Sequence, residues 1–135
     1  MLRTSLWPLQ QAIYNRLNQD SLLKQRISGV FDKVPKGKPF PYVHIGAPVV
    51  TPFETKTTFG ENIPWVLHVY SDYDGKKEAS ELLNLMMQAL TKEPWVVEGF
   101  KVFKFNIEPN TQVLDPAQAG MPYQGILRIR FHINN

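Results

Sequence analysis

Two segments near the C-terminus alternate side chains so regularly that they constrain the fold more than any other part of the sequence. One side of residues 101–108 carries Lys101, Phe103, Phe105 and Ile107, and the other side carries Val102, Lys104, Asn106 and Glu108. In residues 127–134, apolar side chains alternate with Arg128, Arg130, His132 and Asn134. Because successive side chains of a strand point to opposite faces, each segment is predicted to be a strand with one dry and one wet face.

Two other segments follow the helical period. Apolar residues recur at helical spacing over 6–19, with Ser5 as the expected N-cap, and again over 79–90 after the turn at Asp72 to Gly75. Asp20 is the expected N-cap of a further short turn. The sequence therefore predicts two main helices.

Runs of β-branched and aromatic residues predict a brief strand over 30–34 and an antiparallel pair over 42–50 and 63–70. The connections 51–62 and 110–122 are rich in proline, glycine and polar residues, and are longer than most loops. We expect both connections to be mobile until a partner orders them.

The order of these elements lacks a regular β-α-β alternation, which favours an α+β fold. We expect residues 1–135 to form a single domain with a mainly antiparallel β-sheet of about four to five strands and the two main helices packed on one face. The other face would then present a broad, partly apolar surface. Its predicted members are Tyr42, His44, Val66, His68, Tyr70, Arg128, Arg130 and His132. A half-covered sheet of this kind is typical of a subunit interface.

A proline-stiffened loop precedes the strand at 42–50. Pro35, Pro39 and Pro41 remove backbone donors, so the loop lies where no ladder hydrogen bond is required. It is expected to present Lys36, Lys38 and Phe40 to a partner.

Charge is segregated along the 135 residues although the formal net charge is only +3. Residues 1–40 hold seven Lys or Arg against two Asp, residues 41–100 hold four against eight acids, and residues 101–135 hold four against two. Such a layout favours contact with protein surfaces or with further copies of the chain. The chain has no cysteine, and Met1 to Leu9 show no signal-peptide or membrane-spanning run. We therefore expect a soluble protein made in a reducing cytoplasm.

No motif of nucleophilic, nucleotide-binding or metal-dependent catalysis is found. His44, His68 and His132 share a strand parity, but their spacing is not that of a metal site, so we predict no catalytic residue, metal or other cofactor. One of Asp72 and Asp74 is expected to cap the following helix. Arg128 and Arg130 are expected to pair with acids between residues 54 and 98 of a neighbouring copy.

Several short stretches, taken in order, carry a resemblance to a known family. They read Leu17–Leu23 (LNQDSLL), Val30–Pro35 (VFDKVP), Pro41–Gly46 (PYVHIG), Thr55–Thr58 (TKTT), Leu67–Ser71 (LHVYS), Gly75 with its helix, and Gly125–Phe131 (GILRIRF). Together they resemble the tail completion proteins of long-tailed bacteriophages and related prophages. The resemblance covers nearly the whole chain, and the joint occurrence of the stretches makes it specific.

This resemblance implies a tail terminator, also called a tail-to-head joining protein, which is a structural virion protein and not an enzyme. Such a subunit forms a homo-oligomeric, hexameric ring at the head-proximal end of the tail tube, ends tube growth and creates the surface that docks onto the head. The implied partners are further copies of the chain, the tail tube protein and a head-completion or connector protein. DNA would pass through the ring without tight binding.

The residues chosen as candidate interface positions come from the basic loop, the tip of the first long connection and the last strand. They are Lys36, Lys38, Phe40, Thr55, Lys56, Thr57, Thr58, Arg128, Arg130 and His132. A small nucleic-acid-binding module that uses four of these basic side chains, Lys36, Lys38, Arg128 and Arg130, is the alternative function.

Overall fold

The computed structural model describes residues 3–54 and 59–134, which form three helices and one seven-stranded sheet. The helices are α1 (Leu6–Asn18), α2 (Ser21–Lys24) and α3 (Lys77–Leu90). The strands are β1 (Val30–Phe31), β2 (Tyr42–Pro48), β3 (Thr51–Glu54), β4 (Phe59–Ser71), β5 (Lys101–Ile107), β6 (Gln112–Leu114) and β7 (Tyr123–Asn134). The α+β class and the two main helices, α1 and α3, are confirmed. The short turn expected after Asp20 is present as α2.

The sheet has the order β1-β2-β4-β7-β5, with β3 also paired to β4 and β6 to β7. All pairs are antiparallel except β1 with β2, so the sheet is mixed and larger than the expected four to five strands. The expected antiparallel pairing of 42–50 with 63–70 is confirmed, with Tyr42 opposite Tyr70 and His44 opposite His68.

Two strands lie where mobile loops were expected. Residues 51–54 pair with 59–62, which makes β4 longer than predicted, and 112–114 pair with 124–126. Each segment is only a few residues long, and ladder hydrogen bonds to a long neighbouring strand hold it in the sheet. Pro52 is tolerated because β3 is an edge strand, where a missing donor can face solvent.

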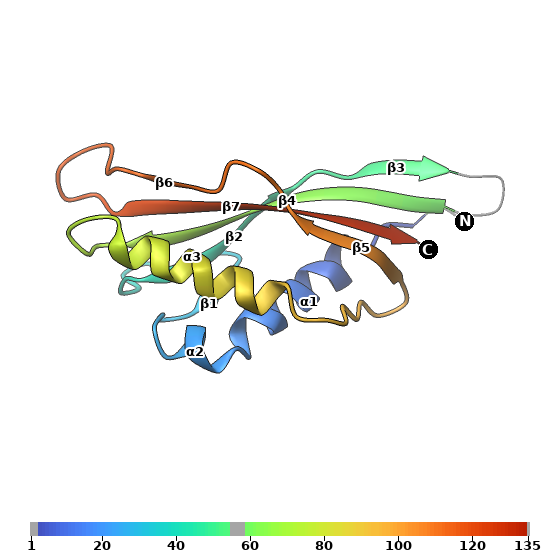
Figure 1. The fold of residues 1–135 in the computed structure, drawn as a ribbon, viewed down its shortest axis with the longest axis horizontal. Coiled ribbons are helices and arrows are strands. Elements are labelled where there is room, and N and C mark those ends of the chain that lie inside the picture. The colour runs from blue at the N-terminus through green and yellow to red at the C-terminus, as the bar shows by residue number, and fades with distance from the viewer. Residues whose placement is uncertain (1–2, 55–58, 135) are drawn as a thin grey trace.

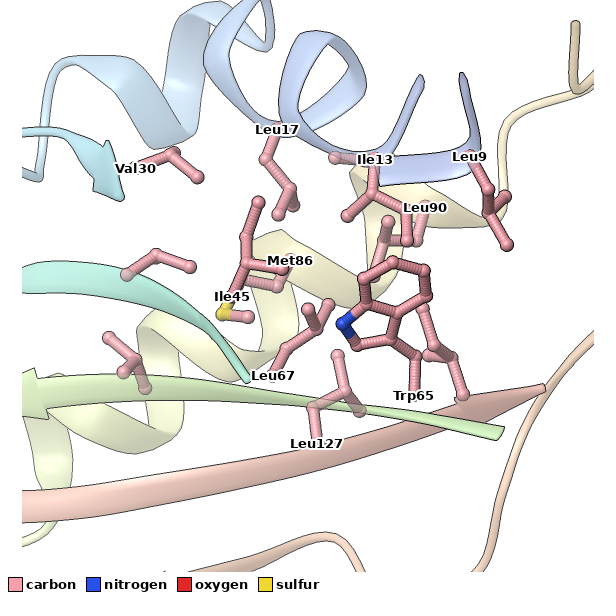
Figure 2. Close-up of a cluster of buried hydrophobic side chains, with 14 of the residues drawn as sticks. Leu9, Ile13, Leu17, Val30, Ile45, Trp65, Leu67, Met86, Leu90 and Leu127 are labelled. Atoms are coloured by element: carbon pink, nitrogen blue, oxygen red, sulfur yellow. The ribbon is translucent and has the colours of Figure 1, made fainter. Parts of the chain in front are cut away.

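All three helices lie on one side of the sheet, as Figure 1 shows. Between the layers, Trp65, Leu67 and Leu127 of the strands point toward α1 and α3 (Figure 2). The helices contribute Leu9, Ile13, Leu17, Met86 and Leu90 to this cluster, all fully buried. The predicted dry face of residues 127–134 therefore forms part of the core, and no helix of the described residues covers the opposite face of the sheet.

Helix capping agrees only in part with the prediction. Asp20 caps α2, because its side chain accepts a hydrogen bond from the Leu23 amide at 3.0 Å. Ser5 lies at the N-cap position of α1, but its hydroxyl donates to Glu61 and makes no cap hydrogen bond. The N-cap of α3 is Lys76, so neither of the two aspartates in the preceding turn takes that place.

Candidate functional site

The face of the sheet that lies away from the helices is the candidate functional site, and we call it the open face. Strand register defines the open face. Val43, Val69 and Leu127 face the helices, and the residues that alternate with them along each strand face the other way. The residues expected on this face are all partly exposed: Tyr42, His44, Val66, His68, Tyr70, Arg128, Arg130 and His132. This part of the sequence-based prediction is confirmed.

An aromatic cluster occupies the end of the open face nearest β1, and we call it the aromatic corner. It consists of Phe31, Phe40, Tyr42, His44, His68 and Tyr70. The rings of Phe40 and Tyr42 stack with centroids 5.2 Å apart, and Tyr42 lies 5.4 Å from Tyr70. Each such pair contributes about 0.5–1.5 kcal/mol beyond its buried area.

The basic loop folds onto the aromatic corner. Lys38 Nζ lies 5.4 Å from the centre of the Phe31 ring, and Phe40 is part of the stack itself. Lys36 stays exposed at the turn where Gly37 has a φ of 78°. The structure thus brings Lys38 and Phe40 to the open face and leaves Lys36 at the tip of the loop.

His68 is a partly buried histidine of the aromatic corner. Its Nδ1 accepts a hydrogen bond from Gln124 Nε2 at 3.0 Å, and the His44 ring stacks on it at 5.6 Å. Burial lowers the pKa of His68, and the positive charges of His44 and Arg128 lower it further. The neutral ring is therefore the favoured form, which agrees with its role as an acceptor.

Gly46 makes room for the His68 ring. A Cβ atom at this position would lie 2.5 Å from the Val66 carbonyl oxygen and 2.8 Å from His68 Nε2. The glycine that ends the PYVHIG stretch is therefore required by the packing of β2 against β4. Trp65 Nε1 also donates to the Gly46 carbonyl at 2.8 Å, which fixes the backbone of Gly46 from the helical side of the sheet.

Arg128 and Arg130 lie at the middle of the open face and are held within the chain. Arg130 Nε pairs with the Glu108 carboxylate, and its Nη1 donates to Asn62 Oδ1 at 2.7 Å. Arg128 Nη1 donates to the Asn110 carbonyl at 2.8 Å. The pairing of Arg128 and Arg130 with acids of a neighbouring copy stays a prediction, and within the described chain Arg130 forms an ion pair with Glu108, which lies between β5 and β6.

A second aromatic group lies at the far end of the open face. Phe103 packs against Phe53 with centroids 6.2 Å apart and against His132 at 5.7 Å. The pairing of β5 shifts register between Val102 and Lys104, and this bulge turns Phe103 to the open face, where it is 50% exposed. The alternation expected for 101–108 is thus broken at this point, and Phe103 lies apart from Phe105 and Ile107, which pack against the core.

Sequence reasoning missed Phe53 and Phe103 for different reasons. Phe53 lies in a segment that was expected to be a loop, and the bulge that exposes Phe103 has no signal in the alternating pattern. The candidate positions Thr55, Lys56, Thr57 and Thr58 lie outside the described residues. Within residues 3–54 and 59–134, no group of three or more His, Asp or Glu side chains is arranged to hold a metal ion. None of the helices described is long and apolar enough to cross a membrane.

Comparison with known proteins assigns this sheet-and-helix architecture to a family. Residues 11–134 match the family model described as tail completion protein gp17. The tail completion protein gp17 of Bacillus phage SPP1 is 35% identical over 127 residues, which cover 94% of this chain and 92% of that protein.

Two solved structures share the fold. A chain in the virion of a native gene transfer agent particle superposes with a TM-score of 0.82 at 23% identity, covering 94% of this chain and 95% of that one. The structure of the SPP1 gp17 protein superposes with a TM-score of 0.62 at 32% identity, covering 99% and 98%. The chain therefore belongs to the tail completion protein gp17 family of structural phage tail proteins.

Proposed function

We propose that this chain is a tail terminator: residues 1–135 act as one domain that assembles into a homo-oligomeric ring, most simply a hexamer, on the head-proximal end of a phage or prophage tail tube. The ring ends tube growth and provides the surface onto which a head-completion or connector protein docks. The observation that carries the proposal is the match to tail completion proteins over nearly the full length of both chains.

The open face supports an assembly role. It combines stacked aromatic rings with basic side chains and has no helix over it in the described chain. Exposed aromatic and arginine side chains are the residues most enriched at protein interfaces. We assign no catalytic role to any residue of this surface.

The ring proposal is tested by adding the purified chain to tail tubes of the phage or prophage that encodes it. We expect sedimentation and native mass spectrometry to detect a ring on tube ends, and capped tubes to stop growing when more tube protein is added. A monomer in free solution agrees with the proposal, because the ring can form on the tube. A chain that neither binds tubes nor stops their growth contradicts it.

A nucleic-acid-binding module is the second candidate, favoured by the aromatic and cationic side chains on one face. The ion pair of Arg130 with Glu108 weakens this candidate, because it removes one cation from phosphate contact. Salt-sensitive DNA binding at micromolar concentration, in the absence of tubes, would favour it over the ring. Absence of DNA binding at low salt would eliminate it.

A further inference from the structure

A groove runs along the outer side of α1, on the helical side of the molecule. It encloses about 680 Å³ and is lined by Trp7 and Tyr14 of α1, by Val96 and Glu98 of the segment between α3 and β5, and by Asp32 directly after β1. None of the described residues that line it belongs to the open face. The groove is therefore a second surface, distinct from the one described above.

The groove gathers three of the largest exposed apolar side chains of the described chain. Trp7 is 62% exposed, Val96 is 76% exposed and Tyr14 is 40% exposed. Trp7 and Tyr14 are two helical turns apart, so they lie on the same side of α1, while Leu9, Ile13 and Leu17 are buried on its inner side. Tryptophan and tyrosine are typical anchors of protein interfaces.

The far wall of the groove is held firmly in place. Arg16 donates to the Pro94 carbonyl at 2.7 Å, and its guanidinium lies 4.0 Å from the centre of the Trp95 ring. Arg3 lies 4.2 Å from the centre of the Phe100 ring at the other end of the same segment. Because this wall is already ordered, less conformational entropy is lost when a partner binds to it.

The charged side chains that line the groove are both acidic. Asp32 and Glu98 are exposed, and neither takes part in an ion pair among the residues described. No lysine or arginine belongs to the described lining. The groove is therefore suited to an apolar side chain flanked by positive charges.

The same chain carries a surface with that chemistry on β5. Phe103 is turned outward by the bulge, and Lys101 and Lys104 are exposed on either side of it. Neither lysine is in an ion pair within the described chain. We call Lys101, Phe103 and Lys104 the β5 ridge.

The positions of the groove and the β5 ridge agree with a head-to-tail contact. β5 and β1 are at opposite edges of the main strand order, and Asp32 follows β1 directly. The β5 ridge also faces the open side of the sheet, whereas α1 lies on the other side. The groove and the ridge are thus two different patches on opposite sides of the sheet, and contact between two different patches generates a ring of identical subunits when the rotation between neighbours closes.

We infer that the α1 groove receives the β5 ridge of a second copy of this chain, with Phe103 entering between Trp7 and Tyr14 and the two lysines meeting Asp32 and Glu98. The inference rests on the proposed ring, for which it names the two contacting surfaces.

Charge reversal on each side tests the contact. The groove variant combines Asp32→Lys with Glu98→Lys, and the ridge variant combines Lys101→Glu with Lys104→Glu. All four positions are exposed, so folding measured by circular dichroism and urea unfolding should be unchanged. Each variant alone should lose ring assembly on tail tubes by about tenfold or more, because like charges then face each other.

Mixing the two variants provides the decisive measurement. In an equimolar mixture the reversed groove meets the reversed ridge, and the natural groove meets the natural ridge, so assembly should recover. Native mass spectrometry should find rings in which the two variants are equally represented. Lys24→Glu combined with Lys77→Glu, also exposed, is the control with the same charge change as the ridge variant, and it should assemble like the wild type.

The possible contrary results separate this inference from the proposed function. If the wild type and both variants assemble equally well, the proposed function stands and the inference is wrong. If the groove variant still forms rings but no longer binds tubes, the groove faces the tube and the inference is also wrong. If the wild type itself forms no ring on tubes, the proposed function fails and the inference fails with it.

Discussion

The two faces of strand β4 differ sharply although their residues alternate one by one. The side chains that face the helices are fully buried or nearly so: Ile63, Trp65, Leu67 and Val69. Those that face away, including Val66, His68 and Tyr70, are partly exposed and lie on the open face. The dry side is accounted for by contacts within the chain, whereas the open side presents aromatic rings to solvent. We therefore expect stability to depend on one side of this strand, and we propose that assembly uses the other.

The segregation of roles has an energetic basis. Burying an apolar side chain stabilises the fold by about 1.5–3 kcal/mol, so the dry side determines whether the chain folds. Partly exposed rings contribute much less to the stability of the monomer. They contribute more free energy when a partner covers them. Substitutions on the dry side should therefore change the free energy of unfolding, and substitutions on the open side should change assembly.

The largest effect is expected from Trp65→Ala. Trp65 is fully buried in the core and donates a hydrogen bond to the Gly46 carbonyl, so its removal should lower the free energy of unfolding by about 3–5 kcal/mol. Tyr70→Ala on the open side of the same strand should cost about 1 kcal/mol, because its contacts are partly exposed ring stacks. Urea unfolding measures the loss of free energy of unfolding in each variant. Equal losses would show that the two sides of β4 contribute equally to stability, contrary to this prediction.

The next effect concerns Glu61, a carboxylate on the dry side. Its Oε1 accepts hydrogen bonds from the Ser5 amide and the Ser5 hydroxyl, both at 2.7 Å, and both residues are buried. Glu61→Ala should lower the free energy of unfolding by about 2 kcal/mol, because two buried donors at the start of α1 lose their acceptor. Glu54→Ala, at an exposed position of β3, is the matched control and should have almost no effect. An unchanged free energy of unfolding in Glu61→Ala would mean that water replaces the carboxylate as acceptor.

A smaller effect separates the two arginines of the open face. Arg130→Gln should lower the free energy of unfolding by about 1 kcal/mol, because Glu108, whose side chain is only 19% exposed, loses its cation. Arg128→Gln removes one exposed hydrogen bond to a carbonyl and should cost less than about 0.5 kcal/mol. Thermal unfolding of the two variants side by side tests this difference. If Arg128→Gln proved the more damaging, the ion pair with Glu108 would not be the interaction that matters.

Periodicity predicted those parts of the fold that local sequence determines. The helices over 6–19 and 79–90 and the pairing of 42–50 with 63–70 are present because their apolar stripes are long and regular. The composition of the open face was predictable for the same reason, since parity along a strand fixes which side chains share a face.

Features that depend on a distant neighbour were not predictable. The strands β3 and β6 exist because β4 and β7 are long enough to pair with them, and at four and three residues they are too short to show an alternating pattern of their own. The outward turn of Phe103 comes from a bulge in the pairing with β7, and the pairing of Arg130 with Glu108 depends on where the chain leaves β5 beside β7. Such contacts join residues far apart in the sequence, which a pattern along one segment does not encode.

The smallest expected effect is a pH dependence that arises on the open side. In the folded chain, burial and the charges of His44 and Arg128 hold the pKa of His68 below its unfolded value of about 6.5. The unfolded chain therefore binds more protons as the pH falls, so the stability that His68 contributes is complete above pH 6.5 or so and is lost as the pH drops toward the folded pKa. Comparing urea midpoints at about pH 7.5 and about pH 5.5, we expect the drop to be smaller in His68→Gln than in the wild type. Burial also lowers the pKa of His132. His132→Gln should therefore also reduce the drop in urea midpoint, independently of His68→Gln. An unchanged drop in His68→Gln would show that His68 already takes up its proton within the folded aromatic corner without cost.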